Sequence, residues 1–149
     1  MSDDVANISF AIGIELAARD LYQAAIDAGA SGTAWPIFVS QHSSYGQRLA
    51  GLIGASANTV DATLFEERKA AFTGDRPANA AFDLENTLVA THASLLGLIT
   101  DNRVADAMAS IASMESHHAA YFAERSGRGG NFDALFINSA APLTPAADS

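Results

Sequence analysis

Residues 102–126 read NRVADAMASIASMESHHAAYFAERS, a stretch with the periodicity of an amphipathic helix. Steps of four and three residues pick out the stripe that would face a core, made of Val104, Met108, Ile111, Glu115, His118 and Phe122. A carboxylate and an imidazole, three residues apart, therefore interrupt an apolar stripe. Because a buried charge is costly unless it is paired or bound to a metal, Glu115 and His118 make a metal site the first hypothesis.

The composition suits one folded domain. The chain has 149 residues, of which 49% are hydrophobic, and it has no cysteine, which excludes disulfides and thiolate ligands. Its acidic start, residues 1–4, does not resemble a signal peptide, and no apolar run approaches the roughly 20 residues of a membrane span. We therefore expect a soluble, cytoplasmic protein. The net charge of −9 argues against nucleic-acid binding, which needs a basic face.

Residues 3–29 carry two conflicting periods. Apolar residues alternate as in a strand from position 8 to position 16, but the segment continues in strong helix formers and no other segment would pair with a strand. We therefore predict one long helix that begins near Ser2 or Asn7 and ends by Gly29. It has a second apolar face, which predicts contact with another copy and hence a homo-oligomer: Phe10, Ile14 and Leu21.

Two more helices are predicted, from Pro36 to about Ser56 and from Pro77 to about residue 100, joined by a long connection over residues 58–76 that contains a charged half-turn. With the helices at 3–29 and 102–126, the connections are short, long and short. This pattern predicts an all-α four-helix bundle with one crossover over residues 1–130. Residues 131–149 form a C-terminal extension, and residues 142–149 are expected to be disordered.

Every predicted helix carries ligand-type residues on its inward stripe. These are Glu15, His42 with Tyr45, Glu85 with His92, and Glu115 with His118. Three of the four histidines lie on such stripes, and this coincidence favours a central metal site. The alternative is a metal-free helical bundle that serves as a binding or assembly module, in which Glu15 pairs with Arg19 one turn later and Tyr22 and Tyr45 are core aromatics.

These residues resemble the ferritin-like superfamily, in particular the small bacterial ferritin-like domain proteins, over about residues 5–126. The resemblance rests on ELAARDLY at 15–22, on Leu84-Glu85 with His92 seven residues later, and on SIASMESHHA at 110–119. The family pattern has Glu on the first helix, Glu-x-x-His on the second, Glu on the third and Glu-x-x-His on the fourth. It implies that Glu15, Glu85, Glu115 and His118 bind iron or manganese, with iron oxidation or oxygen or peroxide handling as the activity.

The second helix departs from this family pattern. In one register His42 takes the place of the bridging Glu and Tyr45 that of the His; in the other His42 is the family histidine and Val39 stands where Glu belongs. Either way a bridging carboxylate is missing, and His92 stands where many relatives carry Tyr. The expected centre is therefore one or two ions of Fe or Mn, or of Zn, or a degenerate site kept for structure. Its ligands are Glu15, His42, Glu85, His92, Glu115 and His118, with Tyr22, Tyr45 and Arg19 around them.

Overall fold

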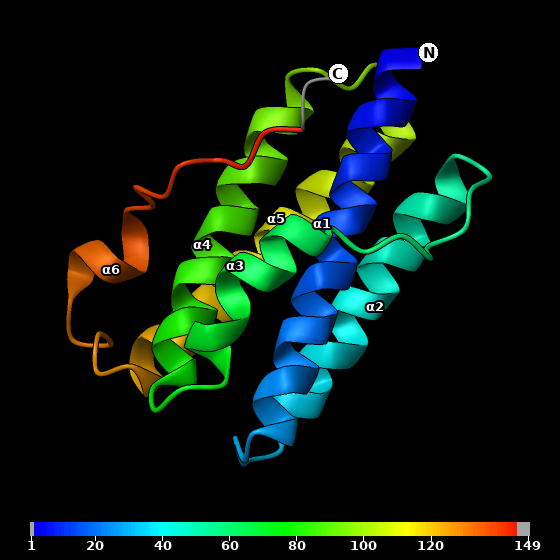
Figure 1. Ribbon diagram of the computed structural model, residues 1–149. Helices are drawn as coiled ribbons and strands as arrows, with labels where there is room; N and C mark the ends of the chain where they lie inside the picture. Colours follow the sequence, from blue (N-terminus) through cyan, green and yellow to red (C-terminus); the bar gives the residue numbers. More distant parts are fainter. Residues whose placement is uncertain (1, 146–149) are drawn as a thin grey trace.

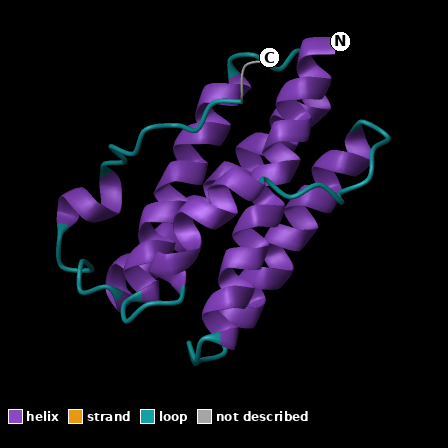
Figure 2. Cartoon of the chain, viewed as in Figure 1, coloured by secondary structure: helices purple, strands orange, loops and turns teal. Residues whose placement is uncertain are grey.

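A computed structural model describes residues 2–145, and these residues form six helices and no strand (Figure 2). The all-α prediction is confirmed. The helices are α1 (Ser2–Asp27), α2 (Ala34–Leu52), α3 (Ala62–Phe72), α4 (Pro77–Leu96), α5 (Asn102–Arg125) and α6 (Phe132–Phe136). Within the described residues, no helix is both long enough and apolar enough to cross a membrane.

The four long helices α1, α2, α4 and α5 lie lengthwise beside one another (Figure 1). The most extensive contacts join α1 to α2 and α4 to α5. Two apolar clusters fill the space between the helices, one around Tyr22, Phe38 and Phe122 and the other around Leu49 and Met108. Along each of the four long helices, the predicted metal ligands lie between the residues of one apolar cluster and those of the other, or beside them. The buried Glu and His side chains therefore have apolar core on both sides along the bundle.

The connection between α2 and α4 contains a helix that the sequence pattern does not predict. The predicted charged half-turn is part of α3, whose first turn is capped by Asp61, since its Oδ1 accepts a hydrogen bond from the backbone N of Leu64 at 2.9 Å. Leu64 is buried in the same cluster as Ile14 and Leu21, and the latter two are fully buried. The prediction that this face of α1 contacts another copy is therefore wrong for Ile14 and Leu21, because α3 covers it.

Gly13 marks the place where the crossover meets α1. Its carbonyl accepts a hydrogen bond from the backbone N of Asp61 at 3.0 Å, and a Cβ on Gly13 would lie 3.5 Å from that nitrogen. Helix α1 thus contacts α2 most extensively, and it also contacts α3 and α4. A helix covered on several sides is apolar nearly all round, which explains the strand-like alternation of its sequence.

The segment that follows α5 returns along α4 (Figure 1). The Asn138 side-chain nitrogen donates to the carbonyl of Asn86 at 2.8 Å, and the backbone N of Leu143 donates to Oγ1 of Thr91 at 2.9 Å. Leu143 also packs against the core cluster around Tyr22. Of the end that is predicted to be disordered, residues 142–145 are described and Leu143 contacts α4, while residues 146–149 lie outside the described residues, so the disorder stays a prediction.

Candidate metal centre

The four long helices bring all six predicted ligands into one buried cluster, referred to below as the Glu/His cluster. Its members are Glu15 on α1, His42 on α2, Glu85 and His92 on α4, and Glu115 and His118 on α5. Five of these residues are 0% exposed and His118 is 4% exposed. Because charged groups are rarely buried without partners, the contacts within the cluster decide what it can do.

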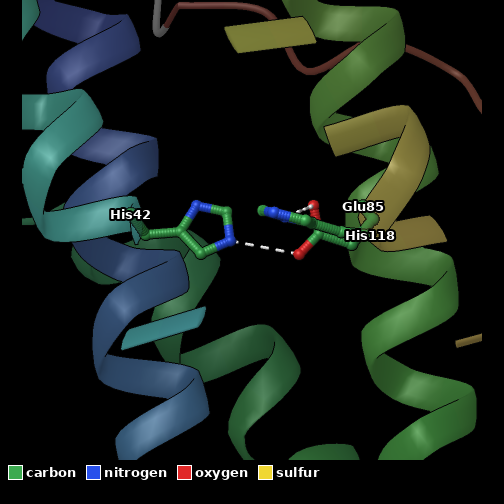
Figure 3. A group of neighbouring side chains, drawn as sticks. All are labelled: His42, Glu85 and His118. Atoms are coloured by element: carbon green, nitrogen blue, oxygen red, sulfur yellow. Dashed lines mark hydrogen bonds and ion pairs between the residues drawn. The ribbon is translucent and has the colours of Figure 1, made fainter. Parts of the chain in front are cut away.

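His42 lies between two carboxylates. Its Nδ1 is 2.8 Å from Oε2 of Glu15 and its Nε2 is 3.1 Å from Oε1 of Glu85. Figure 3 shows that His42 approaches from one side of the cluster while Glu85 and His118 approach from the other. Nδ1 of His118 lies 3.3 Å from the second oxygen of Glu85. Each carboxylate can accept from His42 only if the nitrogen facing it carries a proton, so the two contacts together favour the protonated ring.

His92 joins the cluster from α4. Its Nε2 donates to Oε1 of Glu15 at 2.6 Å and lies 3.5 Å from Oε1 of Glu115. Glu15 therefore contacts an imidazole through each of its oxygens, His92 through one and His42 through the other. The longer distance to Glu115 falls within ion-pair range, but no hydrogen bond is formed there.

Of the two tyrosines predicted around the ligands, Tyr22 makes the closer contact. Its hydroxyl donates to Oε1 of Glu85, and its ring stacks on His42 with the centroids 5.3 Å apart. Tyr45 is half-buried, and its ring lies 5.7 Å from that of His42 and 6.3 Å from that of His118. Among the described hydrogen bonds, none involves the Tyr45 hydroxyl.

Arg19 does not join the cluster. Its Nε donates to Oδ1 of its neighbour Asp20 at 2.7 Å, and its side chain is 30% exposed. The predicted pairing with Glu15 is therefore not formed. Glu15 points into the core, where its partners come from α2 and α4 instead of from its own helix.

Gly46, which the sequence pattern does not mark as a site residue, allows α1 and α2 to approach closely near the cluster. A Cβ on Gly46 would lie 3.3 Å from the Leu16 side chain and 3.7 Å from Cβ of Glu15. Gly46 stands one turn after His42, so the two helices approach closely at the level where His42 meets Glu15. Only the three-dimensional contact identifies its role, because a lone glycine within a helix has no specific meaning in the sequence.

The contacts shift the pKa values of the two paired carboxylates downward. Burial alone would raise the pKa of Glu15, but hydrogen bonds from His42 and His92 outweigh it and lower this pKa. Burial also opposes ionisation of Glu85, but the charge of His42 and hydrogen bonds from His118 and His42 lower its pKa to about 2. Both carboxylates are therefore ionised at neutral pH.

The pKa values of two imidazoles, those of His42 and His92, shift upward. Burial would lower the pKa of His92, but the nearby charge of Glu115 and the hydrogen bond to Glu15 raise this pKa to about 10. Burial would also lower the pKa of His42, but the charge of Glu85 and a hydrogen bond to Glu15 outweigh this effect and raise the pKa. In the protein without metal, two ionised carboxylates thus face two protonated imidazoles.

Glu115 differs from the other two carboxylates. Burial raises its pKa well above the ordinary value, and neither of its oxygens has a hydrogen-bond partner. Nδ1 of His92 and Nε2 of His118 are also buried without partners. These four atoms belong to the Glu/His cluster, and the rest of the described chain contributes two more, one each on Gln41 and Arg128. Since buried polar atoms almost always have partners, this concentration makes the cluster a candidate binding site.

Comparisons with known proteins give no match: no family model matches the chain, and no curated protein or solved structure does. The chemistry of the cluster is therefore inferred from its donor atoms.

The donor atoms form two groups of the kind that can hold a metal ion. One consists of His42, Glu85 and His118, and the other of Glu15, His42 and Glu115. Within each group the ligand atoms lie within 4.8 Å of one another. His42 belongs to both groups, so the two are not independent.

Proposed function

We propose that this protein is a ferritin-like metal-binding protein that holds a transition-metal ion in its Glu/His cluster. The supporting observation is that four buried oxygen and nitrogen atoms without hydrogen-bond partners lie in this cluster. Glu115 has two free oxygens, and His92 and His118 each have a free ring nitrogen. A polar network built only for structure would be expected to satisfy these atoms, because an unpaired buried group costs about 1–3 kcal/mol.

The first donor group indicates which ions suit the site. His42, Glu85 and His118 offer two imidazole nitrogens and a carboxylate. This set is used for non-haem Fe²⁺ and for catalytic Zn²⁺. Glu15 and Glu115 add oxygen ligands on the other side of His42, which suit Fe²⁺ or Mn²⁺. We therefore propose iron or manganese as the resident ion, with zinc able to replace it.

The shared ligand His42 sets the expected stoichiometry. A neutral imidazole offers a lone pair on one of its ring nitrogens, while the other carries the proton. His42 therefore serves one of the two donor groups at a time, and we expect about one ion per chain. Binding also displaces the protons that His42 and His92 carry in the metal-free protein, because a metal ligand must be deprotonated.

The proposed activity is redox chemistry of iron oxidation or of oxygen or peroxide handling, and it rests on the resemblance to ferritin-like proteins. When bound, iron or manganese would supply the redox change. The residues of the chain keep water away from the centre by burying it, and the hydroxyl of Tyr22 holds Glu85 in place. His118, slightly exposed beside half-buried Tyr45, marks the side of the cluster nearest to solvent.

A metal-free helical module is the second candidate, and the paired contacts of the cluster favour it. Glu15 and Glu85 already face protonated His42 and His92, so the charges of these four groups balance. In that case the cluster would serve only to fix how the helices pack, and the bundle would act as a binding or assembly module.

Elemental analysis and metal titration separate the two candidates. The protein is purified without added metal, analysed, stripped with a chelator, and titrated with Fe²⁺ under anaerobic conditions and with Mn²⁺ and Zn²⁺. A metal site predicts about one ion per chain and a stabilisation of about 2.7 kcal/mol at one hundred times the dissociation constant. No uptake, together with unfolding that is unaffected by metal or chelator, would instead support the metal-free module.

A further inference from the structure

An open cavity of about 660 Å³ lies outside the Glu/His cluster, on the outer side of α4. It is lined by residues of α3, α4 and α6 and of the segments before and after α6. None of the six cluster residues lines it. Its volume is in the range of small-molecule sites, which is about 300–1,000 Å³.

Arg128 lines this cavity and has an unused hydrogen-bond donor. Its guanidinium carbon lies 4.7 Å from the centre of the Phe82 ring, over the ring face, which is a cation–π contact. Its Nη1 is buried and has no hydrogen-bond partner. The guanidinium group of arginine is a cation in proteins, so the cavity contains a positive group with a free N–H.

A second arginine lines the same cavity. Arg68 extends from α3 and is partly buried, and neither it nor Arg128 forms an ion pair with any described residue. The acidic residues of the lining, Asp83 and Asp133, are exposed, so water can solvate them. In a chain with eight basic residues and a net charge of −9, two arginines without acidic partners share one cavity.

The walls of the cavity are held by specific contacts. Asn138 is bonded to the carbonyl of Asn86 on α4, and Asn131 caps α6 by accepting from the backbone N of Asp133 at 3.0 Å. Ile137 and the ring of Phe82 supply apolar surface beside the two arginines. The lining thus combines positive donors with apolar surface and amide groups.

The geometry points to a binding site for a small organic oxyanion, a carboxylate or a phosphate ester, held by Arg128 and Arg68. The planar guanidinium fork matches both groups and commonly binds them through two parallel hydrogen bonds. The organic part of the ligand would lie against Phe82 and Ile137.

Calorimetric titration of the full chain tests this site. The probes are glutarate, a dicarboxylate, and glycerol 3-phosphate, a phosphate ester, with glycerol as the neutral control. We expect one or both anions to bind and glycerol not to bind. Binding of glutarate alone assigns the site to carboxylates, and binding of glycerol 3-phosphate alone assigns it to phosphate esters. The site is rejected if neither anion binds.

Three variants locate the binding. Arg128→Gln and Arg68→Gln should each weaken it at least about 10-fold, which corresponds to 1.4 kcal/mol. Arg48→Gln, which changes an exposed arginine on α2, should leave it unchanged. An equal loss of affinity in all three variants would mean general charge attraction and would overturn the proposal.

If Arg128→Gln does not fold, NMR of the unmodified protein takes the place of this variant. The signal of the Arg128 Nε–H group should shift when the anion is added, and an unchanged signal would contradict the assignment.

Discussion

Oε1 of Glu15 lies 2.6 Å from Nε2 of His92, although 77 positions of the chain separate the two residues. The other oxygen of Glu15 accepts from Nδ1 of His42. One buried carboxylate thus links α1 to both α2 and α4. His42 bonds to both Glu15 and Glu85 only when both of its ring nitrogens carry protons, whereas a metal ligand needs a deprotonated nitrogen. The same atoms can therefore serve either a hydrogen-bonded network or a metal centre, and protons and metal compete for them.

His118 and His117 provide a matched pair of variants. His118→Ala removes a buried ligand candidate whose Nε2 has no partner, and we expect metal affinity to fall at least about 10–100-fold, the loss that follows from removing even an outer partner of a metal site. His117→Ala should have no such effect, because His117 is exposed and its Nδ1 bonds to the carbonyl of Ser113. Competition with a chromophoric chelator measures both. Equal affinities for the two variants would remove His118 from the site.

His42→Glu should change the number of ions bound. A carboxylate can bridge two cations and offsets their repulsion, so titration with Mn²⁺ should saturate at about two ions per chain instead of one. Without metal the same variant should be less stable by about 3–5 kcal/mol, because Glu15 and Glu85 lose the imidazole between them. Denaturant unfolding with and without Mn²⁺ checks this. An unchanged stoichiometry in a folded variant would contradict the role given to His42.

The stability of the metal-free protein should be greatest in a window of weakly acidic pH. The pKa of Glu85 is lowered to about 2, so its stabilising contribution is present above the ordinary pKa of 4.5 and is lost as the pH falls toward 2. The pKa of His92 is raised to about 10, so its contribution is complete below 6.5 and is lost as the pH rises from 6.5 to 10. The raised pKa of Glu115 also favours the lower pH. The window therefore lies between about pH 4.5 and 6.5.

Melting curves of chelator-treated protein from pH 3 to 10 measure this window. We expect the melting temperature to decrease by several degrees between pH 6.5 and 9, since a change of 1 kcal/mol shifts it by about 2–8 °C in domains of this size. His92→Gln should reduce that decrease. Excess metal should offset it, because metal binding improves as the ligands lose their protons. A melting temperature that rises from pH 6.5 to 9 without metal would show that the imidazoles are not protonated in the fold.

The hydroxyl groups of Tyr22 and Tyr45 should contribute differently. Tyr22→Phe removes a donor to the buried carboxylate of Glu85 and should cost about 1–3 kcal/mol of unfolding free energy. Tyr45→Phe removes a hydroxyl that has no described hydrogen bond and should change stability little. Denaturant unfolding of both variants, with chelator present, makes the comparison. Equal stabilities would mean that Tyr22 does not hold Glu85.

Helical periodicity predicts the features of the fold that depend on residues close together in the chain. The steps of three and four residues that placed Glu115 beside His118 also placed the other cluster residues on buried faces. The pairing of Glu15 with Arg19 was predicted on the same local basis and is not formed. Glu15 instead pairs with His42 and His92 on other helices, and no local pattern encodes which helices meet.

The role of α3 also depends on long-range contacts. Leu64 and Phe72 are its two buried residues, and the charged residues between them hide its apolar side in the sequence. Their burial depends on the chain crossing α1 at Gly13, where the carbonyl is bonded to Asp61. The lack of hydrogen-bond partners for the two oxygens of Glu115 is likewise not predictable from the sequence, because it depends on which side chains surround Glu115 in the folded chain.

Anomalous diffraction from crystals grown with excess Mn²⁺ or Zn²⁺ shows whether the Glu/His cluster holds a metal ion. The data are collected on the two sides of the absorption edge of the metal, so that the ion is identified by element. A metal centre predicts a peak inside the bundle at about 2.0–2.2 Å from nitrogen atoms of His42 and His118 and an oxygen of Glu85. Peaks confined to the protein surface, with His42 still bonded to Glu15 and Glu85, would contradict a metal centre and favour the metal-free network.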